Sequence, residues 1–472
     1  MDRLKPLDAV FVDAEDEDEN TSMAIASIAV FQGPAPAHKE VMALIAQRLP
    51  LVPRYRQKLR TVPFRLGRPV WVDDPDFDLG YHVRRTALPE PGEYRQLADL
   101  MARVMSHRLD RSHPLWEYWV VEGLAQDRWA LISKVHHCMI DGVGGADLYR
   151  VIMEPASSPG QPPGSASPED PPADQPPSAI SLAARATADI AQLPLRQARA
   201  LSGAVADPGG TIRQVVGGAQ AVARFAPSLW PAARSSLSGN IGQQRRYAWT
   251  QVSLEDIKVI KREFGGTVND VVLAAISGGF RALLLDRGEQ PEPHEVPSLV
   301  PVSVRPPGDS GSFGNQVSAT VTNLPVHNAD PVERLIAVRA EQDSLKASHE
   351  AMIGQALVAL GRYSLYPVTS WLVRKAFLLP QREIVTVTTN VPGPQQPLYW
   401  MGRRLEQIIP YVPIASRVRI GISIFSYDGS VTFGLTADYA ANPDLDVLAR
   451  GIEHGVSDLL LSARRHAAPA AS

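Results

Sequence analysis

The sequence is short of cysteine, of net charge and of long hydrophobic runs. Cys138 is the one cysteine among 472 residues, which excludes an intramolecular disulfide and a zinc site built from cysteines. The 47 lysines and arginines nearly balance the 50 aspartates and glutamates, so the basic excess of a nucleic-acid-binding protein is missing. No uncharged apolar run approaches the roughly 18 residues that a membrane-spanning helix needs.

The first residues also lack the apolar segment that directs a protein to secretion. Met1 to Pro6 precedes an acidic run from Asp13 to Glu19 instead. We therefore expect a cytoplasmic protein, which can lie on a membrane without crossing it.

The composition changes twice along the chain. We predict an N-terminal lobe over residues 1–154, a linker and connector over residues 155–246, and a C-terminal lobe over residues 247–472. Both outer segments mix helical and strand patterns, which favours two similar α/β lobes.

The middle segment combines a proline-rich stretch with a basic one. Nine of the 23 residues in 155–177 are proline, a composition typical of a disordered linker. Residues 179–246 carry eight arginines, no lysine and two aspartates. Two interpretations stay open: a solvated helical connector, or a basic amphipathic surface on which Phe225, Leu229 and Trp230 anchor the chain to anionic lipid.

Hydrophobic periodicity predicts the regular elements of both lobes. The predicted helices cover 41–49, 97–105, 268–285, 331–348 and 445–461, and the predicted strands cover 115–121, 129–135, 298–304, 317–321, 384–389, 418–425 and 431–435.

The segment from His136 to Gly142, HHCMIDG, follows a predicted strand and precedes a glycine-rich turn. A histidine at a strand end is unprotonated near neutral pH and can act as a general base. Because neighbouring side chains on extended backbone point to opposite sides, His136 and His137 cannot do the same work. Asp141 could orient the imidazole of His137, or pair with an arginine and fix the turn.

Three other interpretations of this segment are open from the residues alone. It could bind a metal, although adjacent histidines rarely share one and no third ligand cluster is evident. It could be a structural turn with buried histidines. Cys138 could be a nucleophile, although a lone cysteine is more often a small buried apolar residue.

The segment resembles the HHxxxDG signature of the bacterial wax ester synthase/acyl-CoA:diacylglycerol acyltransferase family, a signature that peptide-synthetase condensation domains share. Further segments resemble this family in particular. They are Leu7-Asp8, Trp71 to Asp78, Pro114-Leu115-Trp116, Asn269-Asp270, Pro301 to Arg305, Gly314-Asn315, Thr389 to Pro394 and Gly421 to Gly429. The resemblance spans residues 7 to about 438, nearly the whole chain.

The resemblance implies an α/β fold of two lobes like those of chloramphenicol acetyltransferase. Each lobe would be a mixed sheet flanked by helices, with the HHxxxDG loop midway along a tunnel between the lobes. Acyl-CoA would be the co-substrate, with no bound cofactor and no metal. A neutral lipid alcohol would be the second substrate, and the protein would lie at the inner membrane or a lipid-droplet surface.

The resemblance also implies roles for single residues. His137 would be the general base, His136 its support, Asn269 a candidate donor to the oxyanion, and Asp141 a loop-positioning carboxylate paired with Arg305. Residues expected to contact substrate are Pro114, Leu115, Trp116, Gly142 and Asp270. Two structural alternatives remain: Asn269 as a helix cap, and residues 114–116 as the start of a core strand.

The expected reaction moves a long-chain acyl group from acyl-CoA to the hydroxyl of diacylglycerol, giving triacylglycerol and CoA. An alcohol pKa of about 16 against about 6.5 for histidine makes full deprotonation uphill by roughly 13 kcal/mol. Proton transfer to His137 must therefore accompany attack on the thioester, and no acyl-enzyme is needed. The rivals are a wax ester synthase using fatty alcohols, a condensation-type acyltransferase on another acceptor, and a non-catalytic lipid-surface protein.

Overall fold

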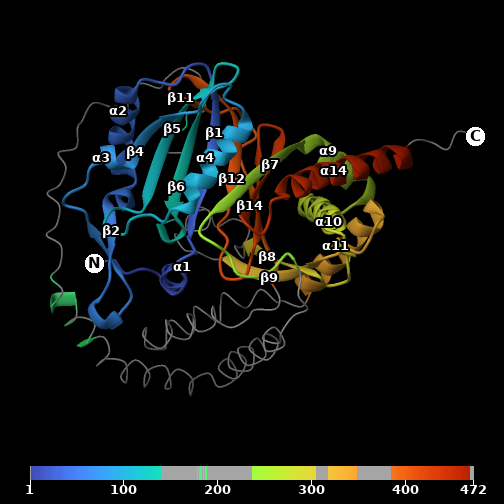
Figure 1. Ribbon diagram of the computed structural model, residues 1–472, viewed down its shortest axis with the longest axis horizontal. Coiled ribbons are helices and arrows are strands. Elements are labelled where there is room, and N and C mark those ends of the chain that lie inside the picture. Colours follow the sequence, from blue (N-terminus) through green and yellow to red (C-terminus); the bar gives the residue numbers. More distant parts are fainter. Residues whose placement is uncertain are drawn as a thin grey trace, which may run out of the picture.

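The computed structural model describes residues 2–139, 236–303, 317–347 and 384–467, together with short pieces between residues 153 and 188. These residues form two six-stranded sheets, and helices cover each sheet. Each sheet with its helices is one lobe, and the two lobes lie side by side (Figure 1). The prediction of two α/β lobes is confirmed. The linker at 155–177, and most of the basic segment at 179–246, lie outside the described residues.

The first lobe is built on a mixed sheet in the order β11-β12-β1-β6-β5-β4. Strands β4 and β5 are parallel, and the other neighbours are antiparallel. The strands are β1 (Ala24–Gln32), β4 (Val83–Ala87), β5 (Trp116–Leu124), β6 (Arg128–His136), β11 (Tyr399–Trp400) and β12 (Arg403–Tyr411), with a separate hairpin of β2 (Gln57–Arg60) and β3 (Val70–Asp73). The helices are α1 (Pro6–Glu17), α2 (His38–Arg48), α3 (Leu79–His82) and α4 (Tyr94–Ser106).

The second lobe repeats this plan with the order β7-β14-β13-β10-β8-β9, in which β10 runs parallel to both β13 and β8. Its strands are β7 (Arg245–Ser253), β8 (Val296–Ser303), β9 (Val317–Leu324), β10 (Thr386–Pro392), β13 (Ile420–Tyr427) and β14 (Ser430–Asp438). Its helices are α9 (Leu254–Phe264), α10 (Val268–Asp286), α11 (Pro331–Ala347) and α14 (Leu445–Ala467), and α10 and α14 pack together beside the sheet (Figure 1).

Helix α10 is the one described helix that is long and apolar enough to cross a membrane. Most of it is buried in the second lobe, where Val272, Ile276 and Phe280 have no exposed surface. This burial is typical of the central helix of a globular domain, and we assign α10 to the core.

The predicted helices and strands each correspond to an observed element. Helix α4 buries Leu97, Met101 and Met105 at helical spacing, as the periodicity predicts. The two strands predicted at 115–121 and 129–135 are the adjacent strands β5 and β6. Strand β6 positions the candidate site, because the histidine pair stands at its end.

Strands β11 and β12 belong to the first sheet although they follow β10 of the second sheet in the chain. Strand β12 pairs with β1 over residues 405–411, so the predicted segment 247–472 contributes strands to both lobes. Pro410 favours an edge or a loop on sequence grounds. The two-residue strand β11 pairs only with residues 403 and 404 of β12. The rest of β12, which includes Pro410, therefore forms the edge of the sheet, where a proline is tolerated.

The two lobes meet where β12 packs against β14 and β13 (Figure 1). The carbonyl oxygen of Pro410 accepts hydrogen bonds from the Tyr247 hydroxyl at 2.6 Å and from the Ser423 hydroxyl at 2.8 Å. Gly434 of β14 lies directly against the same carbonyl, and a Cβ at this position would overlap the oxygen. The junction is therefore close backbone packing fixed by two hydroxyl donors.

Candidate active site

Strand β6 carries the histidine pair to the edge of the first lobe, where neighbouring elements hold its last residues. The amide of His136 donates to the carbonyl of Leu115 at 2.9 Å, and the amide of His137 donates to the carbonyl of Met23 at 2.9 Å. Two residues before His136 in the same strand, the buried Lys134 ammonium donates to the carbonyls of Val104 and His107 at 2.8 and 2.6 Å. The backbone that presents the two imidazoles is thus fixed on three sides.

The imidazole of His136 is buried, with 1% of its surface exposed, and its two nitrogens have different surroundings. Nδ1 accepts the amide N–H of Cys138 at 3.1 Å, and Nε2 lies 3.3 Å from Oε1 of Glu15 at ion-pair distance. Burial alone lowers the pKa of His136, but the side chains of Cys138 and Glu15 raise it above its ordinary value. The Cys138 amide is directed at Nδ1, so the proton that faces the Glu15 carboxylate lies on Nε2.

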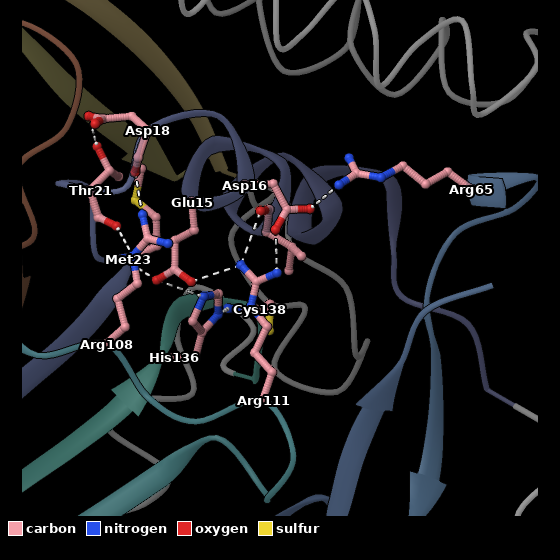
Figure 2. Close-up of polar contacts among 11 residues, drawn as sticks. Glu15, Asp16, Asp18, Thr21, Met23, Arg65, Arg108, Arg111, His136 and Cys138 are labelled. Atoms are coloured by element: carbon pink, nitrogen blue, oxygen red, sulfur yellow. Dashed lines mark hydrogen bonds and ion pairs between the residues drawn. The ribbon is translucent and has the colours of Figure 1, made fainter. Parts of the chain in front are cut away.

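Glu15 of α1 is the centre of a buried polar cluster beside His136 (Figure 2). Its carboxylate accepts the Met23 amide at 2.6 Å and the Arg111 guanidinium at 2.9 Å. Burial alone would raise the pKa of Glu15, but His136, Met23 and Arg111 lower it to about 2. Arg111 also binds Asp16 at 2.6 Å, and Glu15 stays ionised at neutral pH.

His137 is half-buried as a residue, and its imidazole lies outside this polar cluster. It stacks on the ring of Phe11 at 4.0 Å between centroids, with 24° between the planes. Its Nδ1 has no hydrogen-bond partner among the described residues. Burial lowers the pKa of His137 to about 4. His137 is therefore neutral at physiological pH, as a general base must be.

One face of α1 covers both histidines. Phe11 and Glu15 are four residues apart on this helix, so their side chains project from the same side. Phe11 meets His137 and Glu15 meets His136. We expected the two imidazoles to do different work, and they have different partners on α1: Glu15 for His136 and Phe11 for His137.

The Pro114-Leu115-Trp116 segment is buried at the start of β5, next to the end of β6. Leu115 and Trp116 have no exposed surface, and the Trp116 indole donates to the carbonyl of Tyr55 at 2.8 Å. His82 stacks on Trp116 at 4.5 Å between centroids. This packing agrees with the structural alternative, in which residues 114–116 begin a core strand. A contact between these residues and the substrate stays a prediction.

Asn269 and Asp270, at the start of α10, have separate roles. Asp270 is buried and accepts the Thr267 amide at 2.7 Å, while the Thr267 hydroxyl accepts the Asp270 amide at 3.2 Å. This reciprocal pair caps the helix, so capping does not occupy Asn269. The side-chain oxygen of Asn269 instead accepts the Asn390 amide at 3.1 Å, which joins the two family segments at 269–270 and 389–394.

Several predicted site residues lie outside the described residues: Asp141, Gly142 and Arg305. Within the part of the chain that is described, no group of three histidine, cysteine or acidic side chains could hold a metal ion. Sequence reasoning missed Glu15 and Arg111, which lie 96 residues apart. The signal available for Glu15 was the acidic run from Asp13 to Glu19, which is unusual in a helix that packs on a core.

Two family models match the chain. The wax ester synthase/diacylglycerol acyltransferase catalytic domain matches residues 4–272, and the WS/DGAT C-terminal domain matches residues 313–459. The chain belongs to the wax ester synthase/diacylglycerol acyltransferase family. It is therefore an acyl-CoA-dependent O-acyltransferase of lipid metabolism, as the HHxxxDG resemblance predicts.

Relatives of this acyltransferase cover nearly its full length. A Mycobacterium tuberculosis protein named probable diacylglycerol O-acyltransferase is 41% identical over 98% of this chain and 97% of its own. A wax ester synthase/diacylglycerol acyltransferase structure from Marinobacter aquaeolei VT8 has a TM-score of 0.67 at 26% identity, covering 98% and 100% of the two chains. A starter condensation domain of rhizomide synthetase, solved with C8-CoA and Leu-SNAC, shares the fold with a TM-score of 0.57 at 16% identity, covering 98% and 94%.

Proposed function

We propose that this acyltransferase moves a long-chain acyl group from acyl-CoA to the free hydroxyl of diacylglycerol, giving triacylglycerol and CoA. The observation that carries the proposal is the half-buried His137 directly after β6, within the family signature, whose lowered pKa keeps its imidazole neutral. The name of the mycobacterial relative supports diacylglycerol as the acceptor.

In the proposed mechanism His137 takes the hydroxyl proton as the alcohol oxygen attacks the thioester carbonyl. The tetrahedral intermediate collapses with cleavage of the C–S bond, and the proton on His137 passes to the departing CoA sulfur. A positioned base contributes on the order of 10²–10⁴-fold to such a step. Asn269 is the proposed oxyanion donor, because its amide N–H₂ is not used in the pair with Asn390.

The supporting parts of the site are proposals too. Asp141 and Arg305 would hold the loop, Gly142 would let substrate approach the backbone, and the substrates would meet in a tunnel between the lobes. The Cys138 thiol takes no part, because the thioester is already activated and its carbonyl can be attacked directly.

The low pKa of His137 predicts an unusual pH profile. The neutral imidazole persists down to about pH 5, so kcat/KM should stay level there and fall only near pH 4. The unfolded chain takes up this proton near pH 6.5, so the lowered pKa makes folding less stable as pH falls from 6.5 towards 4. Activity should therefore be measured beside circular dichroism at each pH, and an acid limb with a midpoint near 6.5 in folded protein contradicts the assignment.

A panel of acceptors tests the proposed substrate. CoA release should be fastest with diacylglycerol and slower with monoacylglycerol, without any carrier protein. Fatty alcohols as the preferred acceptors would favour the wax ester synthase alternative, and a requirement for carrier-bound thioester would favour a condensation-type enzyme. CoA release with none of these acceptors would contradict the proposal.

We also propose that the protein acts while peripheral at the inner membrane or a lipid-droplet surface. The acceptor is insoluble in water, so it must be taken from a lipid phase. Presenting diacylglycerol in anionic vesicles and pelleting them in the same assay measures turnover and attachment together. Full turnover of vesicle diacylglycerol with no protein in the pellet would reject stable attachment.

A further inference from the structure

We propose that Glu15 is a positioning residue for this acyltransferase: its buried carboxylate fixes the orientation of His136 and of the backbone that carries His137. The inference rests on the proposed function, because it assumes that His137 is the general base. It adds a residue from α1, far from the HHxxxDG signature in sequence.

The first step is the position of the carboxylate. Glu15 is 2% exposed and faces three groups at once: the Met23 amide, the Arg111 guanidinium and Nε2 of His136 (Figure 2). A buried carboxylate without such partners would be strongly disfavoured. Arg111 supplies the compensating charge and leaves the second oxygen, Oε1, directed at Met23 and His136.

The second step is the tautomer of His136. The backbone amide of Cys138 is a fixed donor to Nδ1, so Nε2 is the nitrogen that carries the first imidazole proton. The imidazole proton then sits on Nε2, beside the carboxylate of Glu15. A neutral amide in place of the carboxylate would remove the charge that favours this arrangement and would let the ring rotate.

The third step connects Glu15 to His137 through Met23. The Met23 amide donates to Glu15 at 2.6 Å, and the Met23 carbonyl accepts the His137 amide at 2.9 Å. A shift of the carboxylate therefore moves the peptide segment that holds His137. His137 itself has only the Phe11 ring as a described aromatic neighbour, so its direction depends on this backbone.

The test compares Glu15→Gln with Asp16→Asn as a matched control. Both changes remove one carboxylate that binds Arg111, but Asp16 does not touch His136 or Met23. We expect Glu15→Gln to lower kcat by about 10- to 100-fold with KM for acyl-CoA little changed. Asp16→Asn should stay within about threefold of wild type, and equal rates for the two variants would overturn the proposal.

A second measurement holds even if Glu15→Gln fails to fold. Imidazole ¹⁵N spectra of the wild-type enzyme, with His136 assigned by a His136→Gln variant, should show Nε2 protonated throughout pH 6 to 8, with no titration near pH 6.5. A proton on Nδ1 alone, or ordinary titration near pH 6.5, would overturn the proposal. If the His136→Gln variant is also insoluble, the other ten histidines are replaced one at a time. Each variant loses the signal of its own histidine, and the signal that none of them loses belongs to His136.

The kinetics of His137→Ala separate the two proposals. If this variant keeps wild-type activity, the general-base proposal itself fails. If it is inactive while Glu15→Gln matches Asp16→Asn, only the positioning role of Glu15 fails.

Discussion

His137→Ala is expected to lower kcat by about 10²–10⁴-fold while the protein stays folded. The imidazole is neutral and His137 is half-buried, so its removal takes away the proton acceptor and leaves the fully buried core side chains in place. The lost stack on Phe11 should lower the free energy of unfolding by about 0.5–1.5 kcal/mol beyond the loss of buried ring area. CoA release and thermal unfolding, measured on the same preparation, check both parts.

Cys138→Ala is the control for covalent catalysis. The thiol is buried, and the change keeps the backbone amide that donates to His136. Activity within a few-fold of wild type is expected. A loss as large as that of His137→Ala would point to an acyl-enzyme on the sulfur and would replace the direct-transfer mechanism.

Gly434→Ala is expected to have the largest effect on folding. The new methyl group would overlap the carbonyl oxygen of Pro410 and crowd the Tyr247 hydroxyl, so the first and second sheets would have to separate. Overpacking of this kind costs about 1–3 kcal/mol, and more where backbone is on both sides. Urea unfolding should show a lower midpoint, or the variant should be recovered mainly as insoluble protein.

Gly242→Ala provides the control for this prediction. A Cβ at residue 242 meets only a carboxylate oxygen of Asp438, at 3.5 Å, which is ordinary contact. Its stability should match that of wild type within about 0.5 kcal/mol. Wild-type stability of Gly434→Ala as well would mean that β14 and β12 are not packed as closely as the structure has them.

Local sequence patterns predicted the elements whose signals lie within one segment. The stripe of α4 and the paired strands β5 and β6 are of this kind, because periodicity and burial coincide in them. The position of the histidine pair at the end of a strand could be predicted in the same way, because the apolar pattern of β6 stops just before it. The family resemblance then added roles that periodicity does not contain.

The features that sequence reasoning missed depend on contacts between distant segments. Strand β12 returns to the first sheet, a crossover that Pro410 and the charged residues before it obscure. The pair of Glu15 and Arg111 joins segments 96 residues apart, and the acidic run around Glu15 does not indicate which arginine it binds. Likewise, Asn269 resembled a helix cap until Thr267 and Asp270 were seen to fill that role.

The most direct test of general-base catalysis is a single turnover by His137→Ala. Enzyme loaded with labelled long-chain acyl-CoA is mixed with diacylglycerol at pH 7.5, and the label in triacylglycerol is followed in time. Proton transfer to His137 predicts a rate for the variant at least about 100-fold below wild type, with acyl-CoA still bound. Transfer at the wild-type rate would contradict this mechanism, because the proton would then be leaving the alcohol without this imidazole.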